Sequence, residues 1–157
     1  MSEKQRTLDL LDRAYRAQAW HGPALLETLA GVNAALAAKR PLKGAHTIWE
    51  LVSHVASWNE IVASRLAGGR PKVTPELNFP PTPRPTPAAW KAAQRRLARS
   101  QTRFRKAVAA FPAAKLGRRR PGTTANWNVL IHGQIQHQLY HAGQIAMLRR
   151  GLGKPVG

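Results

Sequence analysis

A cluster of prolines in the middle of the chain most constrains the fold. Seven of the twelve prolines fall between Pro71 and Pro87. Proline lacks a backbone N–H and its ring clashes with the preceding helical turn, so residues 67–86 are predicted to contain no helix. An extended polyproline segment rises about 3.1 Å per residue, so about 17 residues can span about 50 Å. A 20-residue helix is only about 30 Å long. The chain can therefore cross the full length of a helical bundle here.

Apolar residues recur at helical spacing on both sides of this segment. Four helical stretches are predicted. The first starts near Ser2, is interrupted over 20–23 and resumes over 25–36. The second starts at Thr47, the third at Thr86, and the fourth runs over about 126–150. Strand-like alternation is missing from the sequence. We predict an all-α four-helix bundle with a long Pro-rich crossover between helices 2 and 3, forming one domain over residues 1–157.

The chain is strongly basic and its charge is unevenly distributed. It has 25 Lys and Arg against 7 Asp and Glu, a net charge of +18, and no acidic residue follows Glu76. The second half therefore offers no carboxylate as a ligand or a base, and anionic partners should be attracted. Two interpretations stay open: an Arg-rich composition without a function, or anion binding. The second includes nucleic acids, which need about six to ten phosphate contacts for salt-sensitive binding. No known nucleic-acid-binding motif is visible.

The chain contains no cysteine. This excludes a disulfide scaffold, a Cys-ligated zinc and a Cys nucleophile, so any thiol chemistry requires a thiol from outside. The first residues are charged and lack the apolar core of a secretory signal. The sequence also has no run of about 18 apolar residues, so no membrane association is expected. A cytoplasmic location is the resulting prediction.

Three histidines are the strongest candidates for a functional site. His137 and His141 are four residues apart in the predicted fourth helix, so they project from one face about one turn apart. If His54 in the second helix faces them, three imidazoles converge. Three nitrogen donors with an open fourth position are typical of a catalytic metal site. The spacing alone also fits partly buried histidines that bond to the backbone or to water.

Other polar residues are secondary candidates. Glu50 precedes His54 by one turn and either orients its imidazole or closes a helix cap with Thr47. His132 lies about 140° around the helix from His137 and is not expected to be a ligand. The remaining candidates are expected to be turn, packing or pocket-wall residues: His21, His46, Trp58, Tyr140 and Gln144.

Several motifs together resemble a known family. They are HVASW over 54–58, HQLYHAGQI over 137–145, LRR over 148–150, AHTIWEL over 45–51 and WHGP over 20–23. The sequence resembles the DinB/YfiT-like metal-dependent proteins of the DinB superfamily over nearly its whole length. The resemblance implies a four-helix bundle, often a homodimer, that holds zinc, nickel or another divalent metal through three histidines. Its metal ligands here would be His54, His137 and His141.

Characterised members of this family include S-transferases that use bacillithiol or mycothiol, and a mycothiol-dependent isomerase. The resemblance therefore implies a thiol-dependent S-transferase in detoxification or stress response, with a small anionic thiol such as bacillithiol and an electrophile as substrates. A cation held by three neutral imidazoles lowers the pKa of a bound thiol or water. A metal-dependent hydrolase, a nucleic-acid-binding protein and a non-catalytic metal-binding protein stay open as alternatives. Candidates to pair with a carboxylate of the thiol are Arg65, Arg149 and Arg150.

Overall fold

The computed structural model describes residues 1–154 and residue 156, and it is all-α, with no strand in that part of the chain. Its α-helices are α1 (Glu3–Tyr15), α2 (Leu25–Leu29), α3 (Ala34–Ala38), α4 (Ile48–Leu66), α5 (Pro75–Asn78), α6 (Pro87–Ala110) and α7 (Trp127–Gly151). A 3-10 turn over Ala113–Lys115 follows α6. None of the described helices is both long enough and apolar enough to cross a membrane.

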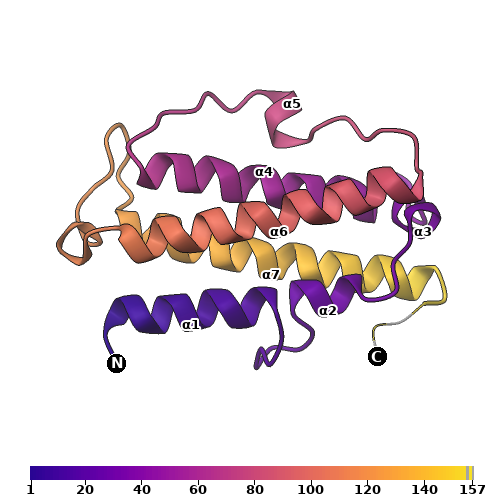
Figure 1. Ribbon diagram of the computed structural model, residues 1–157, viewed down its shortest axis with the longest axis horizontal. Helices are drawn as coiled ribbons and strands as arrows, with labels where there is room; N and C mark the ends of the chain where they lie inside the picture. The colour runs from indigo at the N-terminus through magenta and orange to yellow at the C-terminus, as the bar shows by residue number, and fades with distance from the viewer. Residues whose placement is uncertain (155, 157) are drawn as a thin grey trace.

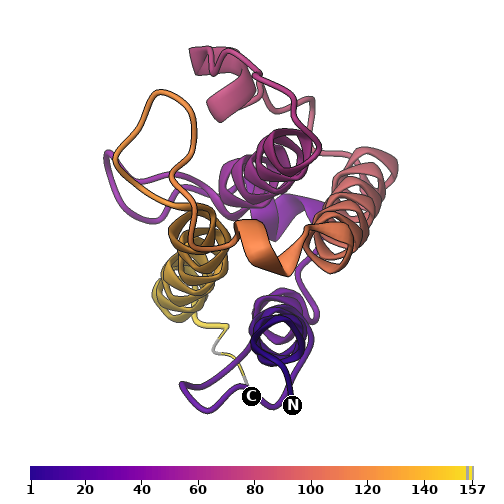
Figure 2. The same ribbon diagram turned by 90° about the vertical axis from the view of Figure 1, so that its left-hand side faces the viewer.

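The long helices form a bundle in which the short helix α2 continues the side that α1 begins. α4, α6 and α7 run side by side, and α1 and α2 follow each other along the remaining side (Figures 1 and 2). α4 contacts both α6 and α7, while α1 packs against α6 and α7 and α2 packs against α7. The predicted helical bundle is confirmed, and its most buried long helix, α4, carries His54.

Side-chain caps set the starts of the helices. The Ser2 and Thr47 hydroxyls accept hydrogen bonds from the third residue of α1 and α4, and in return the side chains of Gln5 and Glu50 accept from the cap N–H groups. These two capping boxes satisfy backbone donors that the first helical turn leaves free. Asn126 caps α7 with a single hydrogen bond, which its Oδ1 accepts from the N–H of Val129 at 2.9 Å.

The first predicted helix is more fragmented than expected. The prediction that it resumes as one helix over 25–36 is wrong, because α2 ends at Leu29 and α3 begins only at Ala34. Between them the backbone is extended at Ala30, with ψ 127°, and left-handed at Gly31, with φ 73°. Glycine adopts the left-handed conformation without steric cost, which allows the chain to turn sharply here.

The Pro-rich crossover contains one short helix. The prediction that residues 67–86 contain no helix is wrong for α5, whose N-cap Thr74 accepts from the N–H of Leu77 at 3.2 Å. Pro75 occupies the first position of α5, where the missing N–H costs nothing. The rest of the segment runs along α4 to the start of α6 (Figure 1), as expected for a crossover.

A buried polar layer separates two apolar clusters. One cluster includes the apolar residues within 48–56 of α4 and the other includes Val62 and Ala63, so Asn59 lies between them. The Asn59 Oδ1 accepts hydrogen bonds from the Nε2 groups of Gln134 and Gln138, each at 2.8 Å. The Asn59 Nδ2 donates to α6, at Ser100 Oγ and Gln101 Oε1. This polar layer joins α4, α6 and α7 next to the level of His137.

Candidate metal centre

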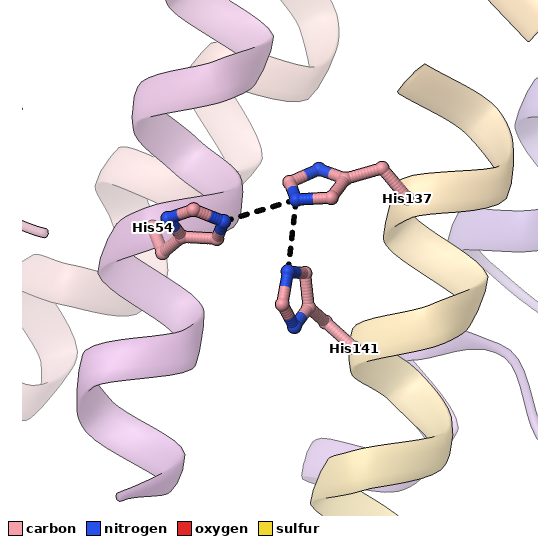
Figure 3. Close-up of side chains that lie close together, drawn as sticks. All are labelled: His54, His137 and His141. Carbon is pink, nitrogen blue, oxygen red and sulfur yellow. Dashed lines mark hydrogen bonds between the residues drawn. The ribbon is translucent and has the colours of Figure 1, made fainter. Parts of the chain in front are cut away.

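The three predicted histidines meet between α4 and α7. His54 projects from α4, and His137 and His141 project from successive turns of α7 toward it (Figure 3). The His137 Nε2 lies 2.9 Å from the His54 Nε2 and 2.8 Å from the His141 Nε2. One nitrogen from each residue lies within 4.8 Å of the others. The expected clustering of the three imidazoles is therefore observed.

Hydrogen bonds at the Nδ1 atoms of two imidazoles determine which ring nitrogen carries the proton. The His54 Nδ1 is 2.7 Å from the carbonyl oxygen of Asn78, and the His141 Nδ1 is 2.6 Å from the Gln144 Oε1. Both oxygens only accept hydrogen bonds, so each Nδ1 carries the proton and each Nε2 presents a lone pair to the centre. This is the outer hydrogen-bonding pattern that prepares histidines for a metal.

The inner contacts cannot all be hydrogen bonds. With lone pairs on the Nε2 atoms of His54 and His141, a proton on the His137 Nε2 can serve only one of its two short contacts. The other contact then joins two nitrogens with no proton between them. In addition, the His137 Nδ1 is buried and has no hydrogen-bond partner among the described residues. A cation at the centre would satisfy all three inward lone pairs.

The cluster is buried and its imidazoles are neutral at pH 7. Burial, followed by repulsion between the neighbouring imidazoles, lowers the pKa of His137 to about 3. Burial also lowers the pKa of His54 to about 4 and acts in the same direction on the pKa of His141. Because metal ligation requires the neutral form, the site is ready to bind a cation at neutral pH.

The nitrogen separations fit a common metal geometry. Zn–N bonds of about 2.0–2.1 Å in a tetrahedral site place the nitrogens about 3.4 Å apart. The separations here, two near 2.8 Å and all within 4.8 Å, bracket that value. A cavity of about 340 Å³ opens onto the site and is lined by His54 and His137 together with Trp58, Asn78 and Arg120. The residues present therefore fit a divalent ion, which His54, His137 and His141 would hold beside this cavity.

The crossover forms one wall of this site, which the sequence did not reveal. Asn78 uses its carbonyl oxygen for His54 and its Oδ1 for the indole N–H of Trp58, at 2.8 Å. The ring of Phe79 stacks on His54 on one side and on His46 on the other, with centroid distances of 4.0 and 3.9 Å. α5 and the residue after it therefore hold the imidazole of His54 in place.

Other candidate residues have structural roles. Glu50 closes the helix cap and pairs with Arg40, so it does not orient His54. Gln144 has a larger role than the expected packing one, because it bonds to His141. His132 lies apart from the cluster and its Nε2 is 3.4 Å from the Thr7 hydroxyl.

Among the remaining aromatic candidates, His21 is exposed and Trp58 lines the cavity. Tyr140 is largely exposed, and its ring lies edge-on to that of His141 with the ring centroids 5.1 Å apart.

The three candidate arginines have different surroundings. Arg149 is 8% exposed and its guanidinium donates to the carbonyl oxygens of Thr28 and Ala30. It fixes the end of α2, so the expectation that it binds a cofactor carboxylate is wrong. Arg150 is exposed. The guanidinium of Arg65 lies 5.8 Å from the ring centroid of Trp58, which places it near the site.

Comparisons with known proteins agree with this architecture. The family model of the DinB superfamily matches residues 18–145, which is most of the chain. The chain belongs to the DinB superfamily. A search of curated proteins found no match to this DinB protein. Its fold is similar to that of a conserved protein from Enterococcus faecalis, known from a crystal structure. The TM-score is 0.75 at 20% sequence identity, over 98% of this chain and 99% of the other.

Proposed function

We propose that this DinB protein binds one divalent metal, zinc or nickel, through the Nε2 atoms of His54, His137 and His141. The observation that carries the proposal is the orientation of the three imidazoles. The Nε2 of His137 lies 2.9 Å from that of His54 and 2.8 Å from that of His141, and these nitrogens carry too few protons for both contacts to be hydrogen bonds. A bound divalent ion would lower the pKa of a thiol or a water molecule at its open position.

We further propose that the protein is a thiol-dependent S-transferase that takes its thiol from a small anionic cofactor such as bacillithiol. Two features support this. The chain has no cysteine of its own, and its cavity has a cationic wall at Arg120. The chain holds the site in place: Asn78 and Gln144 bond to two of the imidazoles, and Trp58, Val62 and Leu130 line the cavity.

Cobalt substitution tests this function. The cobalt-loaded protein is titrated with bacillithiol, mycothiol and glutathione, and its absorption spectrum is recorded. Thiolate ligation should add a sulfur-to-metal charge-transfer band, and transfer of the same thiol to an electrophile should exceed the uncatalysed rate. If no thiol changes the spectrum and conjugation stays at the uncatalysed rate, the transferase proposal fails. Hydrolysis by the metal-loaded protein would then be assayed with ester and amide substrates.

A further inference from the structure

Two arginines meet beside the cavity that opens onto the histidines. Arg120 lines this cavity and also a second one of about 600 Å³, whose wall includes Arg65, Arg70, Thr123 and Trp127. Arg120 is thus the residue shared by the two cavities. It reaches this position from the loop between α6 and α7, while Arg65 lies in the last turn of α4.

Among the described residues, neither Arg65 nor Arg120 has a carboxylate partner. The Nε of Arg120 is buried and has no hydrogen-bond partner in the described part of the chain. Burial and the nearby charge of Arg120 lower the pKa of Arg65. Two cations brought together in a hollow without a counterion are an unfavourable arrangement that a bound anion would relieve.

Arg65 lines the larger cavity and lies on the same helix as His54. Arg65 lies eleven residues after His54, which is about three full turns, so both residues lie on one face of α4 about 16 Å apart along its axis. Helical side chains lean toward the N-terminus, and the guanidinium of Arg65 indeed lies over Trp58, one turn from His54. An elongated molecule can therefore contact both the arginines and the histidines.

We propose that Arg65 and Arg120 bind an anionic group, a carboxylate or a phosphate, of a molecule whose other end reaches the three histidines. Planar guanidinium groups match both anions through paired hydrogen bonds. The hydroxyl of Thr123 accepts a hydrogen bond from the N–H of Ala125 at 3.1 Å, so its own proton remains available to the anion. The anion site is independent of the metal, whereas the reach of the molecule to the histidines rests on the proposed function.

The test measures anion binding to protein treated with EDTA. Inorganic phosphate and succinate are titrated separately at an ionic strength held constant with chloride, and tryptophan fluorescence is followed because Trp58 and Trp127 line the two cavities. Arg120→Gln and Arg65→Gln should each raise the dissociation constant about tenfold, the loss expected for one charge-assisted hydrogen bond. The better of the two probes identifies whether the group is a phosphate or a carboxylate.

Arg95→Gln is the matched control, since it removes one positive charge from the exposed face of α6, and it should leave both dissociation constants unchanged. Equal weakening by Arg95→Gln, or binding of neither anion in preference to chloride, would overturn the proposal. If Arg120→Gln does not fold, Arg120→Lys replaces it, and it should weaken binding because it keeps the charge but loses the paired donors.

His137→Ala separates this inference from the proposed function. That variant should lose metal uptake and still bind the anion with wild-type affinity. Failure of metal uptake in the wild type would refute the metal proposal alone. Failure of anion binding in a protein that takes up metal would refute the anion site alone.

Discussion

His132 and His137 occur on the same helix in different surroundings, which provides an internal control for metal binding. His137 points into the cluster, whereas the Nε2 of His132 contacts Thr7 on α1. We expect His137→Ala to reduce the bound metal from about one ion per chain to nearly none, because two imidazoles are a much weaker ligand set than three. His132→Ala should retain the metal. Elemental analysis after dialysis makes the comparison, and a His137→Ala protein that keeps its metal would contradict the proposed site.

The buried imidazoles also predict how the stability of the metal-free protein depends on pH. The ordinary pKa of histidine is about 6.5, whereas the folded protein lowers the pKa of His54 to about 4 and that of His137 to about 3. Between about pH 6.5 and pH 4 the unfolded chain therefore binds more protons than the folded one. The contribution of these groups to stability is complete above pH 6.5 and decreases as the pH falls.

Thermal unfolding of EDTA-treated protein between pH 8 and pH 4 measures this effect. The melting temperature should fall by several degrees across the range. A variant in which His54, His137 and His141 are all replaced by Gln should lose less over the same range, since no buried imidazole of the cluster remains to be protonated. An equally steep decrease in that variant would show that other groups cause it.

For single residues, the sequence predicted the three histidines that cluster between α4 and α7, and it missed the residues around them. His137 and His141 could be found because helical periodicity relates them directly, and His54 because its helix was clear. Asn78, Phe79 and Arg120 belong to segments without periodicity. Their place beside the histidines depends on the path of two connections, which no local pattern specifies.

At the scale of elements, the crossover is part of the site and not only a connection. Phe79 stacks on His54, so Phe79→Ala should weaken metal affinity about 10–100-fold, the usual cost of losing a residue that supports a ligand. The amount of metal bound at saturation should not change. Competition with a chelator measures the affinity. Leu77→Ala is the control, because it removes an apolar side chain two residues earlier, in α5, and leaves the stack of Phe79 on His54 in place.

If Phe79→Ala and Leu77→Ala weaken metal binding equally, the effect comes from loosening of α5 and not from the stack. If neither changes the affinity, α5 only covers the site.

The polar layer makes a separate prediction about the packing of α4, α6 and α7. Asn59→Ala removes the oxygen that accepts from both Gln134 and Gln138, and leaves two buried amide groups short of a partner. We expect a loss of about 2–4 kcal/mol in the free energy of unfolding. Ser100→Ala should cost about 1 kcal/mol, because it removes one acceptor of the Asn59 amide and one donor to a helix carbonyl. Urea unfolding of both variants measures the difference, and similar losses would argue against a network centred on Asn59.

The starts of the long helices α1, α4 and α6 were predictable from sequence, and the connections between helices were not. Thr47 and Ser2 carry their partners three residues later, so both caps are local and readable. Pro75 was interpreted as a helix breaker although, directly after the cap residue Thr74, it begins a helix. The break between α2 and α3 was missed because an alanine-rich sequence favours helix locally, and packing overrides that preference.

For the whole molecule, the basic charge predicts salt-dependent contact with polyanions. Fifteen Lys and Arg follow Glu76 with no acidic residue among them. If this charge serves nucleic acids, DNA or RNA affinity should fall steeply with added salt, because each phosphate contact releases a counterion. His54→Ala should not change it. DNA and RNA binding measured from about 50 to 200 mM salt tests this function of the charge. If neither nucleic acid binds at about 150 mM salt, the charge would serve only to attract small anions.

The distance along the chain between the ligands has a consequence for folding. His54 and His137 are separated by 83 positions, and the chain has no cysteine with which to link such distant segments covalently. A metal ion held by both would close a long loop, much as a disulfide does, but in a form that a chelator could reverse. The three imidazoles lie far apart in the unfolded chain, so a metal would bind the folded state only. Tighter metal binding would therefore raise the free energy of unfolding. The supply of metal would then decide how long each molecule survives heat or proteolysis.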